Sequence, residues 1–359
     1  MNQVAQGRDA DRRLDWVDTA KGICIILVVM MHSTLGIGEA MGGEGFMHAV
    51  VAFAKPFRIP DFFLLSGLFL GRVIDRDWRL FADRRIVHFV YFYLLWLAIQ
   101  SVAKYGEVTH GAGPGAFLAH IAEALVEPYS TLWFIYMLAV FSVVTKLLRR
   151  VPGPLLLAGA ALLQIVPVPT HSYLVEEFCA RYVYFVGGYL FAERIFALAA
   201  SVRAAPAPAL AGLGVWAAVN GWLAFTPSPV AGYPTLASLP VVSLLIGSAG
   251  ALAIVATASL LVRAGGPVTR ALRSCGERSI VIYLAFFLPM AATRLLILKT
   301  GAIADVGLAA LVVTAVAVLL PLAFERMVRG TRLDFLFRRP AAFHIAGVPG
   351  LRGRALGTA

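Results

Sequence analysis

Long apolar runs separated by short polar segments make up almost the whole chain. Most runs are roughly 17 to 25 residues long, which is enough for an α-helix to cross a hydrocarbon core about 30 Å thick. The pattern therefore predicts about ten membrane-spanning helices, at 16–36, 59–74, 86–103, 130–147, 153–168, 178–199, 207–226, 236–262, 279–298 and 303–325.

Three of the predicted spans depart from the simple pattern. The fifth is short and lies between Pro152 and Pro167, and the eighth is long enough to be tilted or broken. The second follows the segment "GFMHAVVAFAKPF", which predicts a short amphipathic or re-entrant helix on the outer face.

The basic residues predict how these spans are oriented. If the N-terminus is cytoplasmic, the outer segments hold only Lys55, Arg58, Lys104, Arg181 and Lys299. The cytoplasmic segments then hold Arg8, Arg12, Arg13, Arg72, Arg76, Arg79, Arg84, Arg85, Lys146, Arg149, Arg150, Arg194, Arg203, Arg263, Arg270, Arg273 and Arg278, followed by an arginine-rich stretch from Arg326 to Arg354. Because basic residues accumulate on the cytoplasmic side of membrane proteins, both termini are predicted to be cytoplasmic.

Composition agrees with a polytopic membrane protein of the all-α class. The 359 residues are 60% hydrophobic and 14% charged, and the mean hydropathy of +0.80 lies outside the range of soluble domains. We expect one transmembrane domain over 1–330 and a basic cytoplasmic tail over 331–359. No small-residue cleavage site follows the first apolar run, so that run is expected to remain as a span. The topology accounts for the net charge of +11, and no nucleic-acid partner is expected.

The three cysteines are expected to be packing residues. Cys24, Cys179 and Cys275 lie in or beside apolar runs, without a CxxC motif or a Cys/His ligand spacing. The sequence therefore predicts neither a disulfide framework nor a metal site.

Ionisable residues inside the first apolar run are the main candidates for function. Eleven residues make about three helical turns, so Lys21 and His32 lie on nearly the same helix face, roughly 16 Å apart along the axis. Asp18 joins this stripe one turn before Lys21. Ionisable residues are energetically costly inside a membrane span, so their presence indicates a functional site. The alternative is a hydrogen-bonded histidine in the bundle and a lysine that extends to the inner interface.

A carboxylate on the second predicted span is expected at a similar depth. Asp61 would orient the His32 imidazole, or it would cap the N-terminus of its own helix beside Pro60. Both roles are compatible. Basic residues are expected at similar heights in the membrane. The outer half of the bundle is therefore predicted to hold a polar cluster of His32, Asp61, Arg58, Arg181 and Arg294.

On the inner side, Lys21 faces the basic loop "GRVIDRDWRLFADRRIVHF". Charges in such a loop usually determine topology. Arg84, Arg85 and His88, at the start of the third span, also suit the binding of an anionic group such as a phosphate.

These residues resemble the integral-membrane acyltransferase family 3. Members carry an arginine or lysine, ten residues and then a histidine on the first membrane helix, and "KGICIILVVMMH" has that spacing from Lys21 to His32, after an acidic residue at Asp18. "PDFFLLSGLFL" looks like the family's phenylalanine-rich segment, with Ser66 at its end. "LWFIYMLAVF", which contains Trp133, and "SIVIYLAFF" are similar to two later helices.

The chain departs from the family pattern in two places. The family commonly has Arg-x-x-Arg at the cytoplasmic entry to the third span, where this chain has Arg85 and then His88. It often has a histidine after the tyrosine of the penultimate helix, where this chain has Ala285 and Phe286. The resemblance is therefore to a divergent branch.

The resemblance implies an O-acyltransferase of the bacterial inner membrane. His32 would be the catalytic base, and Lys21, with Arg84 and Arg85, would help to hold a cytoplasmic acyl-CoA, such as acetyl-CoA, as co-substrate without a permanent cofactor. The acceptor would be a hydroxyl of a cell-envelope carbohydrate or a lipid-linked molecule. Histidine suits this role because its unperturbed pKa of about 6.5 allows proton transfer near neutral pH.

Two other functions fit the same residues. A proton-coupled transporter or lipid-binding protein would use Lys21, His32, Asp61 and Arg294 as a proton or anion path. A catalytically silent scaffold is the third possibility. The chain shows no inverted repeat, which favours the enzyme over the transporter.

Overall fold

The computed structural model describes residues 2–345, with side chains from residue 15 onward. The predicted cytoplasmic side chains of Arg8, Arg12 and Arg13, and the last part of the predicted tail, 346–359, lie outside the described residues. The described chain consists of helices and turns, with one isolated bridge between Pro227 and Thr235. The predicted all-α fold class is confirmed.

The chain divides into two compact units, and each unit combines an early and a late part of the sequence. Within the described residues, the first unit contains 2–68 and 187–327, and the second contains 69–186 and 328–345. The single domain over 1–330 stays a prediction.

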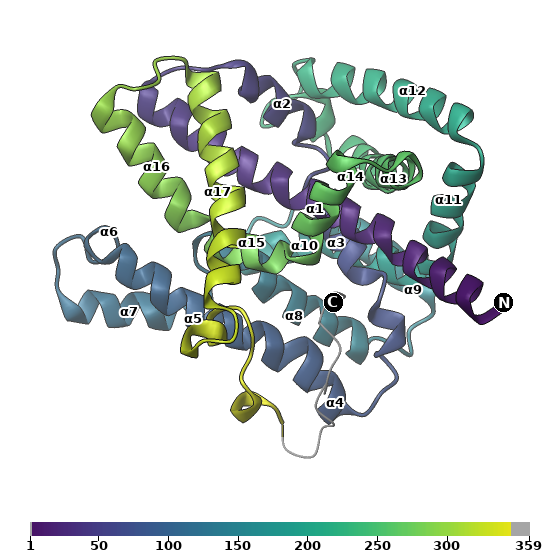
Figure 1. Ribbon diagram of the computed structural model, residues 1–359, viewed down its shortest axis with the longest axis horizontal. Coiled ribbons are helices and arrows are strands. Elements are labelled where there is room, and N and C mark those ends of the chain that lie inside the picture. The colour runs from purple at the N-terminus through teal and green to yellow at the C-terminus, as the bar shows by residue number, and fades with distance from the viewer. Residues whose placement is uncertain (1, 346–359) are drawn as a thin grey trace. The chain divides into compact units, whose positions relative to one another are not determined.

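The first unit is built around its longest helix, α1. Its helices are α1 (Asn2–Met41), α2 (Phe46–Ala54), α3 (Pro60–Gly67), α11 (Ala192–Ala204), α12 (Pro206–Phe225), η4 (Leu236–Ser238), α13 (Pro240–Ala264), α14 (Pro267–Glu277), α15 (Ser279–Ala285), α16 (Phe287–Thr300) and α17 (Val306–Val328). In Figure 1, α1 crosses α14 beside α13, and α3, α15 and α16 also pack against α1. The predicted helix in "GFMHAVVAFAKPF" is present as α2.

Small residues allow α1 and α14 to cross at close range. A Cβ atom on Gly276 of α14 would overlap the backbone carbonyl of Asp18, and one on Gly22 of α1 would overlap the carbonyl of Leu272. The backbones are therefore in direct contact next to Lys21, which fixes the position of that part of α1.

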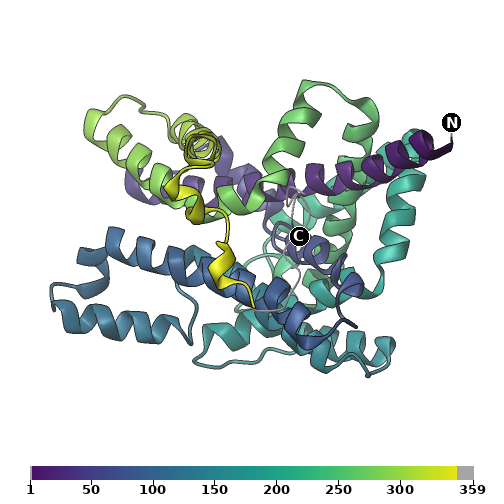
Figure 2. The same ribbon diagram turned by 60° about the horizontal axis from the view of Figure 1, so that its bottom comes forward.

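The second unit packs α5 between other helices and a C-terminal segment. Its elements are η1 (Leu70–Arg72), α4 (Trp78–Ala82), η2 (Asp83–Val87), α5 (His88–Ala103), α6 (Tyr105–Thr109), α7 (Pro114–Ala124), η3 (Ser130–Leu132), α8 (Trp133–Leu147), α9 (Gly153–Ile165), α10 (Tyr173–Leu190, of which the last turn belongs to the first unit), η5 (Arg332–Leu336) and η6 (Ala341–Phe343). In Figure 2, the α6–α7 hairpin continues from the end of α5.

Lys146 differs from its predicted role as a topological charge facing the cytoplasm. Its side chain is buried at the end of α8, where Nζ donates hydrogen bonds to the carbonyls of Ile74 and Arg76 at 2.6 and 2.8 Å. The ammonium also lies 4.8 Å from the ring centre of Trp78 and 4.5 Å from that of Phe81. Two carbonyls and two aromatic faces replace water around this charge, so Lys146 fastens the loop before α4 to α8.

Six helical segments are long and apolar enough to cross a membrane, and two bent helix pairs raise the number to eight. The six are Asp15–Met41, Trp78–Ala103, Ser130–Leu147, Pro206–Phe225, Pro240–Ala264 and Val306–Val328. The two remaining predicted spans correspond to α3 and α9, which are shorter. A multi-pass membrane protein is therefore supported, while the count of ten and the cytoplasmic termini stay predictions.

Two predicted spans differ in shape from the expectation. The sixth and the ninth are bent, by 73° after α10 and by 52° after α15. The second bend has a clear cause, because Pro289 has no N–H to donate to the carbonyl of Ala285. Near the first bend, Gly188 lies directly against the backbone of Leu64, a position that only glycine can occupy. The eighth span is an unbroken helix, α13.

Candidate functional site

The stripe on α1 begins with a buried ion pair. The Lys21 ammonium lies 3.9 Å from the Asp18 carboxylate, and only 8% and 9% of the two side chains are exposed. Lys21 is therefore enclosed within the first unit beside a carboxylate, and its extension to the inner interface stays an alternative. Close by, Arg273 of α14 donates a hydrogen bond of 3.1 Å to the Asp15 carboxylate, so this part of α1 lies among charges of both signs.

His32 lies eleven residues further along α1 and is half-buried. Its ring packs against Phe286, with 5.5 Å between the ring centres and 35° between the planes. Phe286 is fully buried, so it gives the imidazole a rigid apolar wall. Phe286 lies between α15 and α16, near the position where the family often has a histidine, and it supports the His32 ring from there.

Two arginines lie near His32. The guanidinium of Arg58 acts electrostatically on the imidazole. An Arg294 nitrogen lies 3.1 Å from the point where a side chain on Gly36 would begin, and Gly36 is one helical turn after His32. The structure thus brings together three members of the predicted cluster, a base and two permanent cations.

Asp61 belongs to α3, at the start of the second predicted span. Its carboxyl is fully buried near the Cys24 thiol and the Arg58 guanidinium, and among the described residues neither carboxylate oxygen has a hydrogen-bond partner. Cys24 precedes His32 by eight residues, roughly 12 Å along the helix axis. The predicted role of Asp61 in orienting the His32 imidazole stays a prediction.

The capping role predicted for Asp61 needs a correction. Ile59 is the N-cap of α3, and Pro60 is its first helical residue. Asp61 therefore lies inside the first turn, where the helix dipole favours a negative charge.

Ser66 has a local role in α3. Its hydroxyl donates a hydrogen bond of 2.8 Å to the carbonyl of Phe62, one turn earlier. A serine in this arrangement satisfies itself within the helix, so the position does not by itself provide a free donor for a substrate.

The remaining predicted site residues belong to the second unit. Arg181 on α10 pairs with Glu177 at 3.1 Å. Trp133, the first residue of α8, packs edge-to-face against Phe134 and Tyr173. Arg84 and Arg85 lie in η2, a π-helical turn at the start of α5.

Arg85 is the strongest candidate ligand-binding group of the second unit. Only 8% of the residue is exposed. Within the part of the chain that the structure describes, no hydrogen bond or ion pair engages its guanidinium. Burial of an uncompensated charge is costly, and an anionic ligand is the usual compensation. The π-helical turn supports this interpretation because such turns occur frequently at functional sites.

Three residues that were not among the predicted site residues interact with one another at this turn. Asp83, Arg339 and His344 form a hydrogen-bonded group within electrostatic reach of His88. Arg339 and His344 come from the segment predicted to be a basic tail. The segment "LDFLFRRPAAFH" is rich in apolar residues, which is unusual for a tail that only carries charge. This apolar content was the signal in the sequence that the segment packs against the protein.

Helices of this length and apolarity, with ionisable groups inside the bundle, define a multi-pass membrane protein with a buried polar site. The family model described as "Acyltransferase domain" matches residues 14–326, a range that contains all the predicted site residues. The chain therefore belongs to the membrane acyltransferase family 3.

A relative and the known structures complete the comparison. The chain is similar to the inner membrane protein YcfT of Escherichia coli (strain K12), with 26% identity over 236 residues. The match covers 58% of this chain and 64% of that relative, so the chain spans less than two thirds of the relative's length. No solved structure matches the chain.

Proposed function

We propose that this protein transfers an acyl group, with acetyl as the simplest case, from cytoplasmic acyl-CoA to a hydroxyl group. The acceptor is a carbohydrate or lipid-linked molecule of the cell envelope, and the protein acts in the bacterial inner membrane. The single observation that carries the proposal is the position of His32, half-buried on a rigid wall beside the guanidinium of Arg58, in a member of an acyltransferase family.

His32 acts as the general base. One ring nitrogen accepts the proton of the acceptor hydroxyl while the hydroxyl oxygen forms a bond to the thioester carbonyl carbon. The C–S bond then breaks, and the proton on the imidazole passes to the departing thiolate. The products are the acyl ester and free CoA, so atoms and charges balance.

Arg58 and Arg294 stabilise the charge that develops on the thioester oxygen. Both guanidiniums are permanent cations near His32. Arg58 lies just before α3, and Arg294 lies on α16. Fixed positive charges in a site that excludes water stabilise an oxyanion more strongly than they would in water.

Basic groups in each of the two units suit the binding of the donor. Lys21 lies roughly 16 Å from His32 along α1, a distance comparable to an extended pantetheine arm. The buried guanidinium of Arg85, which no hydrogen bond or ion pair engages among the described residues, suits a phosphate of CoA, and Arg84 lies beside it in η2.

The proposal is tested with purified protein in lipid nanodiscs, by following thiol release from acetyl-CoA and acetyl transfer to an envelope-derived acceptor fraction. We expect His32→Ala to abolish thiol release while the protein remains folded and inserted. His171→Ala is the matched control because His171 lies in an exposed loop, and it should retain full activity.

Full activity of the His32 variant would exclude His32 as the base. Proton-driven flux in proteoliposomes without thioester consumption would instead support the transporter alternative. Neither flux nor thiol release would indicate the silent scaffold.

A further inference from the structure

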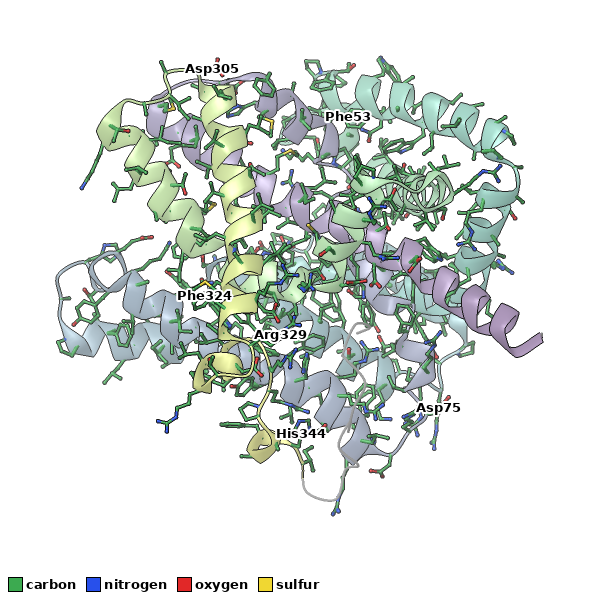
Figure 3. All side chains as sticks on the ribbon, in the orientation of Figure 1. Phe53, Asp75, Asp305, Phe324, Arg329 and His344 are labelled. Atoms are coloured by element: carbon green, nitrogen blue, oxygen red, sulfur yellow. The ribbon has the colours of Figure 1, made fainter. Side chains whose placement is uncertain are left out.

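The described end of the chain is docked on α5 and on the η2 turn that carries Arg84 and Arg85. Residues 332–345, here called the C-terminal strap, follow α17 and belong to the second unit together with α5. Figure 3 labels His344 near the end of this strap. The sequence predicted a basic tail whose arginines determine topology, so this docking is a new feature.

Two aromatic residues of α5 hold the first half of the strap. The Tyr91 hydroxyl donates a hydrogen bond of 2.9 Å to the carbonyl of Phe335, and the Trp96 indole N–H donates one of 3.0 Å to the carbonyl of Leu336. Their rings also contact strap rings, Tyr91 with Phe343 at 4.9 Å and Trp96 with Phe337 at 5.7 Å. Main-chain bonds and ring contacts thus fix the path of the strap.

Asp83 holds the second half of the strap at four points. Arg339 donates one hydrogen bond of 2.7 Å to the Asp83 carbonyl and another of 2.8 Å to its carboxylate. The Ile345 amide donates to the other carboxylate oxygen at 2.9 Å, and the His344 ring nitrogen Nδ1 lies 3.3 Å from the carboxylate. The two charged side chains are only 5% and 4% exposed.

The strap thus binds both the main chain and the side chain of Asp83 in the π-helical turn. Asp83 is the first residue of η2, and Arg84 and Arg85 are the next two. A π-helical turn is rare and needs outside support, because its wider winding weakens the regular hydrogen-bond ladder. Arg339 supplies such support at the Asp83 carbonyl. Without Arg339, a buried carboxylate would lose its main partner, and the turn would rearrange to hydrate it.

We infer that Asp83 and Arg339 are positioning residues that hold the η2 turn, and with it the Arg85 guanidinium, in the geometry that binds the anionic part of the acyl donor. The inference rests on the proposed function, in which Arg84 and Arg85 bind acyl-CoA. Neither Asp83 nor Arg339 needs to touch the donor, because they act through the conformation of the turn.

Docking of the strap is measured first, without any activity assay. In hydrogen–deuterium exchange of the protein in nanodiscs, we expect Arg339→Ala to accelerate exchange in peptides covering 332–345 and 83–91. Arg338→Ala is the matched control: Arg338 is the neighbouring arginine, 55% of its side chain is exposed, and it pairs only with Asp334 at 3.6 Å among the described residues. Exchange should then match the wild type.

The effect on the donor is measured in the acetyl-CoA assay with the same variants. We expect Arg339→Ala to raise the KM for acetyl-CoA roughly tenfold to a hundredfold, with kcat within about threefold of the wild-type value. In an Arg85→Ala background, the same substitution should add little, because both changes remove one interaction. If Arg339→Ala does not fold, Tyr91→Phe is used instead, because it removes only the hydrogen bond to the Phe335 carbonyl. It should give smaller increases in exchange and in KM.

The outcomes separate the inference from the proposed function. If Arg85→Ala raises the KM but Arg339→Ala releases the strap without changing it, the positioning role is refuted. A full effect of Arg339→Ala in the Arg85→Ala background would also refute it, as would a strap that already exchanges freely in the wild type. If Arg85→Ala itself leaves the KM unchanged, it is the donor-binding part of the proposed function that fails.

Discussion

Arg294 of α16 reaches α1 at Gly36, where its guanidinium occupies the space that any larger residue would need. The nitrogen lies 3.1 Å from the position of a Cβ atom on Gly36. Because Gly36 follows His32 by one helical turn, this glycine allows a cation to approach the base.

Gly36→Ala therefore tests the role of Arg294 without removing it. The added methyl group must displace the guanidinium by a few tenths of an ångström, and we expect kcat for acetyl transfer to fall about tenfold. Gly212→Ala is the control, because a Cβ at that position of α12 meets nothing within 4 Å and alanine favours a helix. Equal activities of the two variants would show that the position of Arg294 does not matter for transfer.

The contact between Gly276 and Asp18 leads to a prediction about stability. Gly276→Ala inserts a methyl group between two helix backbones that touch, so α1 and α14 must separate. We expect a loss of about 3 kcal/mol, seen as a lower unfolding temperature in detergent. Gly214→Ala, again in open space on α12, should leave the unfolding temperature unchanged or raise it. An unfolding temperature of Gly276→Ala equal to the wild type would contradict this account of the crossing.

The elements that the sequence predicted well depend on local properties. The run around Lys21 and His32 became one helix because its length and apolarity suffice for that. The π-helical turn at Asp83 could not be predicted in this way, because its partner Arg339 lies 256 residues later in the chain. The chain also contains many other arginines with no such role.

The candidate site shows the same limit. The stripe on α1 follows from helical spacing alone, and the pairing of Lys21 with Asp18 agrees with it. The end of α3 at Gly67, before the predicted end of the second span, was not evident from composition. The proximity of Arg294 to Gly36 is a contact between distant segments, which spacing within one helix cannot reveal.

Lys146 leads to a prediction about the loop before α4. Lys146→Met keeps most of the side-chain volume but leaves the carbonyls of Ile74 and Arg76 without their donor. We expect a loss of roughly 2 to 4 kcal/mol and faster trypsin cleavage after Arg76 in inside-out membrane vesicles. Arg149→Met is the control, since Arg149 is exposed one turn later. Unchanged cleavage and unfolding temperature for Lys146→Met would show that the loop does not depend on this lysine.

A substitution of Asp61 tests whether this carboxylate acts together with His32 in catalysis. Its carboxyl lies near Cys24, which is roughly 12 Å along α1 from His32. Asp61→Asn keeps the shape and a hydrogen-bonding group beside Cys24, so we expect acetyl transfer to stay within about tenfold of the wild type.

His32→Ala, in contrast, should abolish transfer. The comparison is made from initial rates of thiol release at saturating acetyl-CoA, with the amount of folded protein matched by size-exclusion chromatography. If Asp61→Asn is as inactive as His32→Ala, the carboxylate takes part in catalysis. It would then have to reach the imidazole in a conformation of α3 different from the one described, because a carboxyl at the level of Cys24 cannot orient a base two turns away.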